Sequence, residues 1–383
     1  MKTVIYNGTI ITGKKRIENS SVYIEHGRIT EILPEQGGIP GDWQVIDAES
    51  AYVVPGFIDL HFHGAMGKDT MDAAQSSLCL MSEYCATHGV TSFYPTTWSA
   101  SQEDIWAAIL AVKEYKDEVI GARIMGVHIE GPYVNNEYRG AQLPEMIRNP
   151  KRAEYLPWFD SGVVKILTCA PEIEGARELI AEAKTSGVRV SIGHSMANYE
   201  LVNEAAAWGV TQATHIFNGM QGLHHRDPGT VGGVLDNNAI LAQVICDGVH
   251  LHPAVVRMIR AVKTSARIAL ITDSVRGAGI PDGEYEYKRQ VFSVKDGVAR
   301  TPEGSLSGST LTLSAAMRNY IEFTGSPLEE ALATVTAVPA LEMGLAAKKG
   351  RVAVGYDADL VLLDHHLEVM KTMINGEVVY TRD

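Results

Sequence analysis

The sequence predicts an α/β fold, a (β/α)8 TIM-like barrel with a small β-sandwich domain formed from both termini. Three observations predict this fold. Eight apolar runs alternate with helix-like segments in the middle of the chain, and both ends consist of short strand-like runs separated by tight turns. In addition, nearly every central apolar run ends in a side chain that can bind a metal or a proton, as barrel enzymes require.

The composition is that of an ordinary folded protein. The 383 residues allow about two domains at roughly 150 residues each. Hydrophobic residues make up 45% and charged residues 21%, which excludes a disordered chain. With 33 basic and 46 acidic residues, the net charge of −13 argues against a nucleic-acid partner or an anionic membrane surface, because binding to many phosphates needs excess Lys and Arg. A local cationic pocket for one small phosphate stays compatible with this charge.

The sequence predicts neither a signal peptide nor a membrane span. Its start, MKTVIYNGTI, alternates polar and apolar residues, and no uncharged apolar stretch of roughly 18 residues occurs. The four cysteines form no CxxC pair, so we expect reduced thiols and a cytoplasmic location.

Both ends of the chain predict β structure. Strand-like runs in residues 1–53 are split by glycine-containing turns, and residues 350–383 contain an Asn375-Gly376 pair typical of a hairpin. Strands at opposite ends of a chain need partners, and the economical solution is one small β domain built from both. We therefore expect that domain over 1–53 and 350–383, and the barrel over 54–349.

Eight candidate strands lie in the middle of the chain. In order they are VVPGFIDLHFH, VTSFYPT, RIMGVHIE, VVKILTCAPE, VRVSIGH, TQATHIF, ILAQVICDGVH and RIALITD. Between them, Ser101 followed by Asp104 predicts the start of a helix, and Gly187 predicts the end of another. The alternative fold, an open doubly wound sheet, would have a Gly-rich phosphate turn after its first strand, and none is present.

Polar side chains mark the ends of these strands. They are His61, His63, Thr96, Thr97, Glu130, Glu172, His194, His215, Asp247 and Asp273. Because the carboxyl ends of barrel strands converge on one axis, side chains distant in sequence can meet there.

Six of these side chains make one coherent metal-binding set. His61 and His63 are two apart in a strand, so both imidazoles face the same side. The set is His61, His63, Glu130, His194, His215 and Asp273. Taken alone, His194, His215 and Asp273 would each more often be structural residues. Together, four imidazoles and two carboxylates suit zinc, with iron or manganese as alternatives.

Six ligands exceed what one tetrahedral ion with an open position uses. Two ions bridged by Glu130 would use all of them. Asp273 would then accept the proton of an activated water molecule and return it to a leaving group. The predicted class is a hydrolase that carries one or two divalent ions.

At this level of detail the chain resembles a known family over almost its whole length. The motifs that carry the resemblance are PGFIDLHFHG, HIEGPY, GHS, THIFNGM, RDPG, DGVHLHP, LITDS and GSLSGSTLTLS. The first is similar to a motif of the amidohydrolase superfamily, and the succession of the others resembles the N-acetylglucosamine-6-phosphate deacetylases within it. The resemblance implies metal-dependent hydrolysis of the N-acetyl group of N-acetylglucosamine 6-phosphate, giving glucosamine 6-phosphate and acetate.

Two alternatives stay open beside this reading. The substrate could be another N-acyl amino sugar, such as N-acetylgalactosamine 6-phosphate. The protein could also bind a sugar phosphate without catalysis, although all the metal and acid/base positions are present.

The resemblance also implies roles for individual metal-site residues. Glu130, His194 and His215 match the family's main metal site. His61 and His63 match a second site, which some members have lost, and Asp273 matches the general acid/base.

Further residues match substrate contacts of the family. They are Asn218 and Gly219 on the sugar-phosphate loop, His250, Arg226 as a phosphate ligand, and, near the end of the barrel, Leu306. In the family the arginine comes from the neighbouring subunit, which implies a homodimer with Arg226 contributed across the interface. Gln142 departs from the pattern, because it stands where members often carry a histidine; its amide can still donate a hydrogen bond to an oxyanion.

Overall fold

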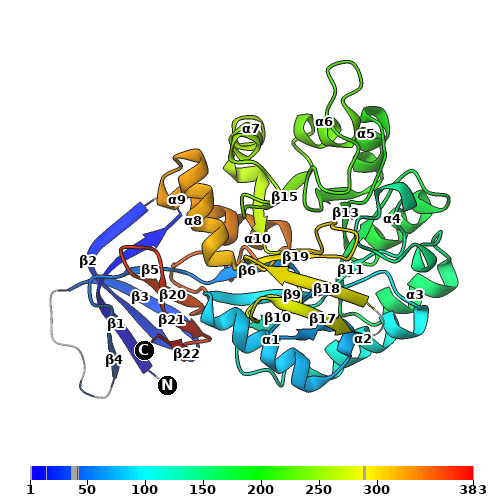
Figure 1. Cartoon of the computed structure of the whole chain (residues 1–383). Helices are drawn as coiled ribbons and strands as arrows, with labels where there is room; N and C mark the ends of the chain where they lie inside the picture. The colour runs from blue at the N-terminus through cyan, green and yellow to red at the C-terminus, as the bar shows by residue number, and fades with distance from the viewer. Residues whose placement is uncertain (1, 14, 36–40, 42, 288–289, 383) are drawn as a thin grey trace.

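The computed structural model describes residues 2–13, 15–35, 41, 43–287 and 290–382. It places a barrel beside a β domain whose sheet contains both the first and the last strand of the chain (Figure 1).

The barrel has eight parallel strands at its centre. They are β6 (Phe57–Phe62), β9 (Val90–Thr97), β11 (Val127–Glu130), β12 (Val164–Cys169), β13 (Arg189–Ile192), β14 (Val210–Ala213), β15 (Leu241–Ile245) and β16 (Ile268–Ile271). A short strand, β10 (Arg123–Ile124), also pairs with β9. All eight strands coincide with the predicted runs. The prediction of a (β/α)8 barrel is confirmed, and the alternative of an open doubly wound sheet is wrong.

The ring of strands closes between the first and the last. The backbone N–H of Asp273 donates to the carbonyl of His61 at 2.9 Å, and the N–H of His63 donates to the carbonyl of Ser274 at 2.8 Å. This closure sets residues from opposite ends of the barrel segment next to each other, and it does so at the carboxyl ends of β6 and β16.

Helices surround the strands (Figure 1). They are α1 (Gln75–Thr87), α2 (Gln102–Tyr115), α3 (Arg152–Asp160), α4 (Ala176–Thr185), α5 (Tyr199–Trp208), α6 (Gly229–Asp236), α7 (Pro253–Lys263), α8 (Leu313–Thr324), α9 (Leu328–Val335) and α10 (Ala337–Glu342). Both predicted helix ends are confirmed. The Ser101 hydroxyl accepts the N–H of Asp104 at the start of α2, and Gly187 follows α4 with a φ of +74°. None of the described helices is both long and apolar enough to cross a bilayer.

The interior of the barrel is apolar at one end and polar nearer the strand ends. The apolar part includes Ile58, Leu60, Tyr94, Ile166, Leu241, Ile245, Ala269 and Ile271. The side chains of His128, Thr168 and Thr214 are also fully buried, and they are linked by hydrogen bonds of 2.7 Å. The barrel therefore offers a dry, rigid support for charged groups at its open end.

Strands from both ends of the chain share one sheet. Its order is β22 (Glu377–Thr381), β21 (Val369–Ile374), β20 (Leu360–Leu363), β5 (Tyr52–Pro55), β1 (Lys2–Thr12), β2 (Lys15–Glu25) and β3 (Arg28–Pro34), with β4 (Gln44–Asp47) also on β1. The prediction of a β domain from both termini is confirmed, as is the hairpin turn at Asn375-Gly376, where both φ angles are positive. The exact domain limits stay a prediction.

Two small sheets lie at the open end of the barrel. A two-stranded sheet, β7 (Gly64–Ala65) and β8 (Lys68–Asp69), follows β6. A three-stranded antiparallel sheet, drawn in yellow in Figure 1, follows β16 and contains β17 (Gly283–Tyr287), β18 (Gln290–Lys295) and β19 (Val298–Arg300). The chain that leaves β19 lines the pocket described below.

Candidate active site and metal centre

The six predicted metal ligands meet at the carboxyl ends of the barrel strands. Glu130 is the last residue of β11, and the other five end or follow β6, β13, β14 and β16. All six are buried. His194, His215 and Asp273 have positive φ angles of 49°, 31° and 49°. Such a backbone is costly for residues with a Cβ, and here it turns each side chain from the strand toward the barrel axis.

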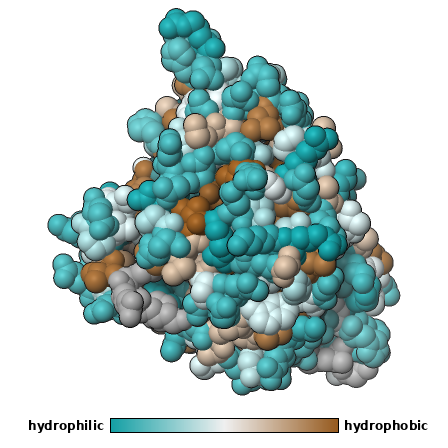
Figure 2. Space-filling model, turned by 90° about the vertical axis from the view of Figure 1, so that its right-hand side faces the viewer, coloured by the Kyte–Doolittle hydropathy of each residue, from teal (hydrophilic) through white to brown (hydrophobic). Residues whose placement is uncertain are grey.

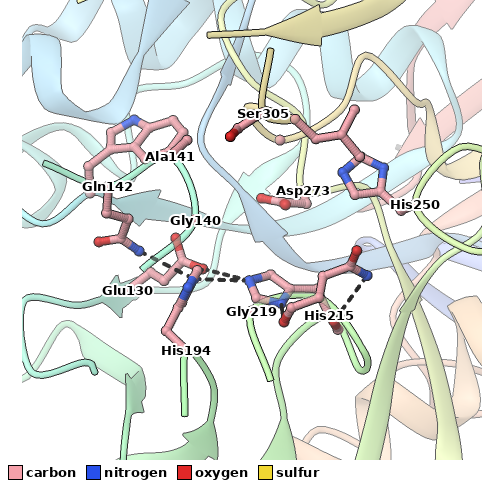
Figure 3. Close-up of a pocket in the computed structure, with 14 residues that line it drawn as sticks. Glu130, Gly140, Ala141, Gln142, His194, His215, Gly219, His250, Asp273 and Ser305 are labelled. Atoms are coloured by element: carbon pink, nitrogen blue, oxygen red, sulfur yellow. Dashed lines mark hydrogen bonds and ion pairs between the residues drawn. The ribbon is translucent and has the colours of Figure 1, made fainter. Parts of the chain in front are cut away.

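The ligand atoms form two groups of three. In the first group, Nε2 of His61 lies 2.9 Å from Nε2 of His63, and Oδ1 of Asp273 lies 3.2 Å from each of them. In the second group, Oε1 of Glu130 lies 3.1 Å from Nε2 of both His194 and His215 (Figure 3). The sequence-predicted set is therefore brought together in space.

Glu130 stands between the two groups. Its Oε1 is 3.6 Å from Nε2 of His61, and its other oxygen is 3.3 Å from Nε2 of His63. One carboxylate thus faces all four imidazoles, which is the position that a bridging ligand would occupy.

The donor set fits a cation better than it fits any hydrogen-bonding scheme. Nδ1 of His194 is 2.9 Å from the carbonyl oxygen of Tyr138, and Nδ1 of His215 is 3.0 Å from that of Asn218. A carbonyl can only accept, so each Nδ1 donates its proton and each ring turns its Nε2 inward toward Glu130. Those two Nε2 atoms lie only 3.2 Å apart. A metal ion between them would satisfy both lone pairs.

The ionisation of the two carboxylates in the site also fits a bound cation. Burial alone raises the pKa of Glu130, but the charge of His61 and the hydrogen bonds of His194 and His215 outweigh it, so the pKa lies well below its usual range. For Asp273, burial is likewise outweighed by His61 and His63, and the pKa is lowered to about 2. Both carboxylates are therefore ionised at neutral pH, and they supply two negative charges for a divalent ion.

A pocket of about 290 Å³ opens over these ligands. Its lining contains Trp98, Glu130, Gly140, Ala141, Gln142, His194, His215, Asn218, Gly219, His250, Asp273, Ser305, Leu306 and Gly308. Five of the predicted substrate residues are among them, and no Lys or Arg of the described chain is. In Figure 3, His250 lies on the opposite side of Asp273 from Gln142, and Ser305 lies above Asp273, so the polar groups surround the space on several sides.

His250 is held with one ring nitrogen free. Its Nδ1 donates to the Asp247 carboxylate at 2.6 Å, and that carboxylate also accepts the backbone N–H groups of His250 and Val249. The carboxylate fixes the tautomer and leaves Nε2 for a ligand in the pocket. Asp247 therefore orients a pocket residue and is not part of either ligand group.

Two of the other polar strand ends, Glu172 and Thr96, have structural partners. Glu172 accepts from Asn135, Ser195 and the backbone of Met196, and it thereby fixes the loop that carries His194. The Thr96 hydroxyl accepts the N–H of Phe62 at 2.9 Å.

Arg226 lies outside the pocket of its own chain. Its side chain is exposed and donates to Nε2 of His225 at 2.7 Å. The chain between β14 and α6, which contains Arg226, projects beyond the helices in Figure 1, and a hydrophilic knob stands out at the same height in Figure 2. The sequence-predicted arginine is thus absent from the lining of the pocket in its own chain.

The sequence reasoning missed several pocket residues, namely Trp98, Gly140, Ala141, Ser305 and Gly308. Ser305 and Gly308 belong to the GSLSGSTLTLS motif, so a signal for them existed. Trp98 directly follows Thr96-Thr97 at the end of a strand, which was a weaker signal for the same edge of the barrel.

Comparisons with known proteins agree with this geometry. The sequence profile of the amidohydrolase family matches residues 52–379. The chain is 34% identical to an N-acetylglucosamine-6-phosphate deacetylase of Bacillus subtilis over 97% of this chain and 95% of that protein. It is 35% identical to an N-acetylgalactosamine-6-phosphate deacetylase of Escherichia coli O157:H7 over 99% of both.

A solved structure matches the whole fold. It is a mutant N-acetyl-D-glucosamine-6-phosphate deacetylase from Mycobacterium smegmatis in complex with N-acetyl-D-glucosamine-6-phosphate. The TM-score is 0.92 at 30% identity, and the match covers 99% of this chain and 100% of that one. The chain thus belongs to the amidohydrolase family, and the resemblance of its motifs to the N-acetylglucosamine-6-phosphate deacetylases is confirmed.

Proposed function

We propose that the chain hydrolyses the N-acetyl group of N-acetylglucosamine 6-phosphate and releases glucosamine 6-phosphate and acetate. The observation that carries the proposal is the pair of buried ligand groups joined by Glu130 at the base of an open pocket. The names of the relatives supply the substrate class.

The metal part of the proposal concerns six residues. Glu130, His194 and His215 would hold one divalent ion, and His61, His63 and Asp273 would hold a second, with zinc first and iron or manganese as alternatives. Such an ion supplies Lewis-acid polarisation of the acetyl carbonyl and lowers the pKa of a water molecule.

Asp273 is the proposed general acid/base. It lines the pocket and its carboxylate is ionised, so it can accept the proton of the attacking water. When the C–N bond breaks, the same carboxyl can deliver that proton to the departing amine. The amine leaves with that proton, and the acid that keeps the oxygen of the water loses its remaining proton to become acetate.

Five lining residues would contact the sugar and its acetyl group. Gln142 offers an amide N–H to the carbonyl oxygen, and His250 offers Nε2 to a hydroxyl. Asn218 and Gly219 would meet the sugar phosphate, and Leu306 would close one wall.

The phosphate requires a cation that the pocket lining does not supply. Arg226 has the planar fork that binds phosphate oxygens, and it sits on the projecting loop. We therefore propose a homodimer in which Arg226 of each subunit completes the pocket of its partner. We also propose a cytoplasmic location, which the four free cysteines support.

One specific observation favours a second substrate. The relative named for N-acetylgalactosamine 6-phosphate is 35% identical, as similar as those named for the glucosamine epimer. A sugar-phosphate-binding protein without catalysis stays the third candidate.

Acetate release separates these candidates. Protein analysed for zinc, iron and manganese would be given four substrates: the two N-acetylated amino-sugar phosphates and their unphosphorylated forms. We expect fastest release from N-acetylglucosamine 6-phosphate, and loss of release after treatment with a chelator. Faster turnover of the galactosamine epimer would establish the second candidate. Tight binding of both phosphates by metal-loaded protein without any acetate would establish the third.

A further inference from the structure

The two ligand groups differ in what holds their imidazoles. His194 and His215 each donate Nδ1–H to a backbone carbonyl. Nδ1 of His61 and of His63 is buried and has no hydrogen-bond partner among the described residues. Ligating histidines almost always have such a partner, because it fixes the ring orientation. Something else must therefore orient His61 and His63.

His63 is held by Trp98. The two rings are stacked, with centroids 4.1 Å apart and planes at 21°. The indole is fixed in turn, because its Nε1–H donates to Oδ2 of Asp69 at 3.1 Å. Asp69 is buried, and the next residue, Thr70, donates both its N–H and its hydroxyl to the carbonyl of His63, at 2.8 and 3.0 Å. Backbone and ring of His63 are thus fixed by one short loop and one tryptophan.

His61 is held by His128. Its ring meets the His128 ring edge to face, with centroids 4.6 Å apart and planes at 71°. Nδ1 of His128 lies 3.0 Å from the carbonyl of Leu60, so that nitrogen carries the proton. The other nitrogen then accepts from the Thr168 hydroxyl at 2.7 Å. Two hydrogen bonds lock His128, and the locked ring limits the rotation of His61.

We propose that Trp98 and His128 are positioning residues. By ring packing, Trp98 holds His63 and His128 holds His61 in ligand geometry. Hydrogen bonds do the same for His194 and His215. The inference rests on the proposed metal centre. It has a directional consequence: an ion at His61, His63 and Asp273 depends on Trp98 and His128, whereas an ion at Glu130, His194 and His215 does not.

Zinc affinity tests this directly. Metal-free protein would be titrated with Zn²⁺ against a chromophoric chelator, which reports each class of site without turnover. His63→Ala and His194→Ala assign the two classes to the two groups. We expect Trp98→Leu to weaken the class lost in His63→Ala by about 10- to 100-fold, the usual effect of removing a residue that orients a ligand. The class lost in His194→Ala should keep its affinity. Trp98→Phe keeps an aromatic ring on His63 and should recover most of the lost affinity.

Two further variants sharpen the test. His128→Leu should weaken the same class as Trp98→Leu. Trp106→Leu is the matched control, because Trp106 is a half-buried tryptophan of α2 that packs against the core and does not line the pocket. It should leave both affinities unchanged. Circular dichroism checks the fold of each variant, and the Trp98 pair decides the question if His128→Leu fails to fold.

The outcomes are distinguishable. Suppose that the wild type has two classes of zinc site, and that Trp98→Leu and His128→Leu either leave both affinities unchanged or weaken both equally. That result overturns the positioning role and leaves the proposed function standing. A wild-type protein with a single class, lost in His194→Ala, also overturns it. A wild-type protein that binds no Zn²⁺ refutes the proposed metal centre itself.

Discussion

The side-chain oxygen of Gln142 accepts hydrogen bonds from both the backbone N–H and the hydroxyl of Ser99. These two donors decide which end of the amide is the oxygen, so the NH₂ group must face the other way. It lies 3.4 Å from Nε2 of His194, at the edge of the pocket. A neutral donor is thereby held in advance of substrate at the pocket, where under the proposed function it would meet the acetyl carbonyl.

Removing that donor should slow turnover. For Gln142→Leu, which keeps similar volume, we expect kcat/KM for the acetylated sugar phosphate to fall about 100-fold, as for loss of one oxyanion donor. Ser99→Ala keeps the backbone N–H that orients the amide and should have a much smaller effect. Steady-state acetate release measures both. Equal activities of Gln142→Leu and wild type would remove Gln142 from the reaction.

Asp273→Asn tests the proton transfer. The amide preserves shape but cannot accept a proton, so kcat should fall about 10²- to 10⁴-fold, the range for loss of a general acid/base. The measurement is acetate release, paired with zinc content and circular dichroism to show that the variant is folded and loaded. A near-normal rate would assign the proton to another group.

Arg226 can be tested by mixing two impaired variants at a substrate concentration well below the KM of Arg226→Ala. Arg226→Ala should raise KM for phosphorylated substrates alone, since phosphate is the group it would bind. If Arg226 acts across an interface, subunit exchange between Arg226→Ala and Asp273→Asn creates dimers with one complete pocket. Random exchange should then restore about one quarter of wild-type activity. No recovery, with exchange verified by mass spectrometry of tagged subunits, would contradict a shared site.

Lys263 should make stability depend on pH. Its side chain is fully buried and donates to the backbone carbonyls of Asn237 and Ile240. Burial lowers the pKa of Lys263 to about 8, below the value of about 10.4 in an unfolded chain. Between these values the unfolded state binds more protons, so this residue's contribution to stability rises with pH and is least favourable below pH 8.

The comparison with Lys263→Met isolates that contribution. Thermal unfolding midpoints would be measured for both proteins at steps from pH 7 to pH 10. We expect the midpoint of the wild type to rise relative to that of Lys263→Met across this window. Two curves that stay parallel would show that the amine has an ordinary pKa in the folded protein.

The metal centre was predictable because the relevant signal is local. His61 and His63 share a strand face by their spacing alone, and each of the other four ligands ends an apolar run or follows it closely. The same logic could not separate Glu130 from Glu172. Both lie at the ends of neighbouring strands. Glu130 is the last residue of β11 and faces the barrel axis. Glu172 lies three residues beyond β12, and its carboxylate accepts hydrogen bonds from the loop that carries His194.

The sequence by itself determined the alternation of strands and helices, the hairpin at Asn375-Gly376 and the set of candidate metal ligands, because periodicity, turn chemistry and residue type act over a few neighbouring residues. Only the tertiary structure decided that Trp98 stacks on His63, that His128 wedges against His61 and that Ser99 orients Gln142. Each of these contacts joins residues from different strands or loops. Their meeting depends on the closure and register of the barrel, which no short stretch of sequence encodes.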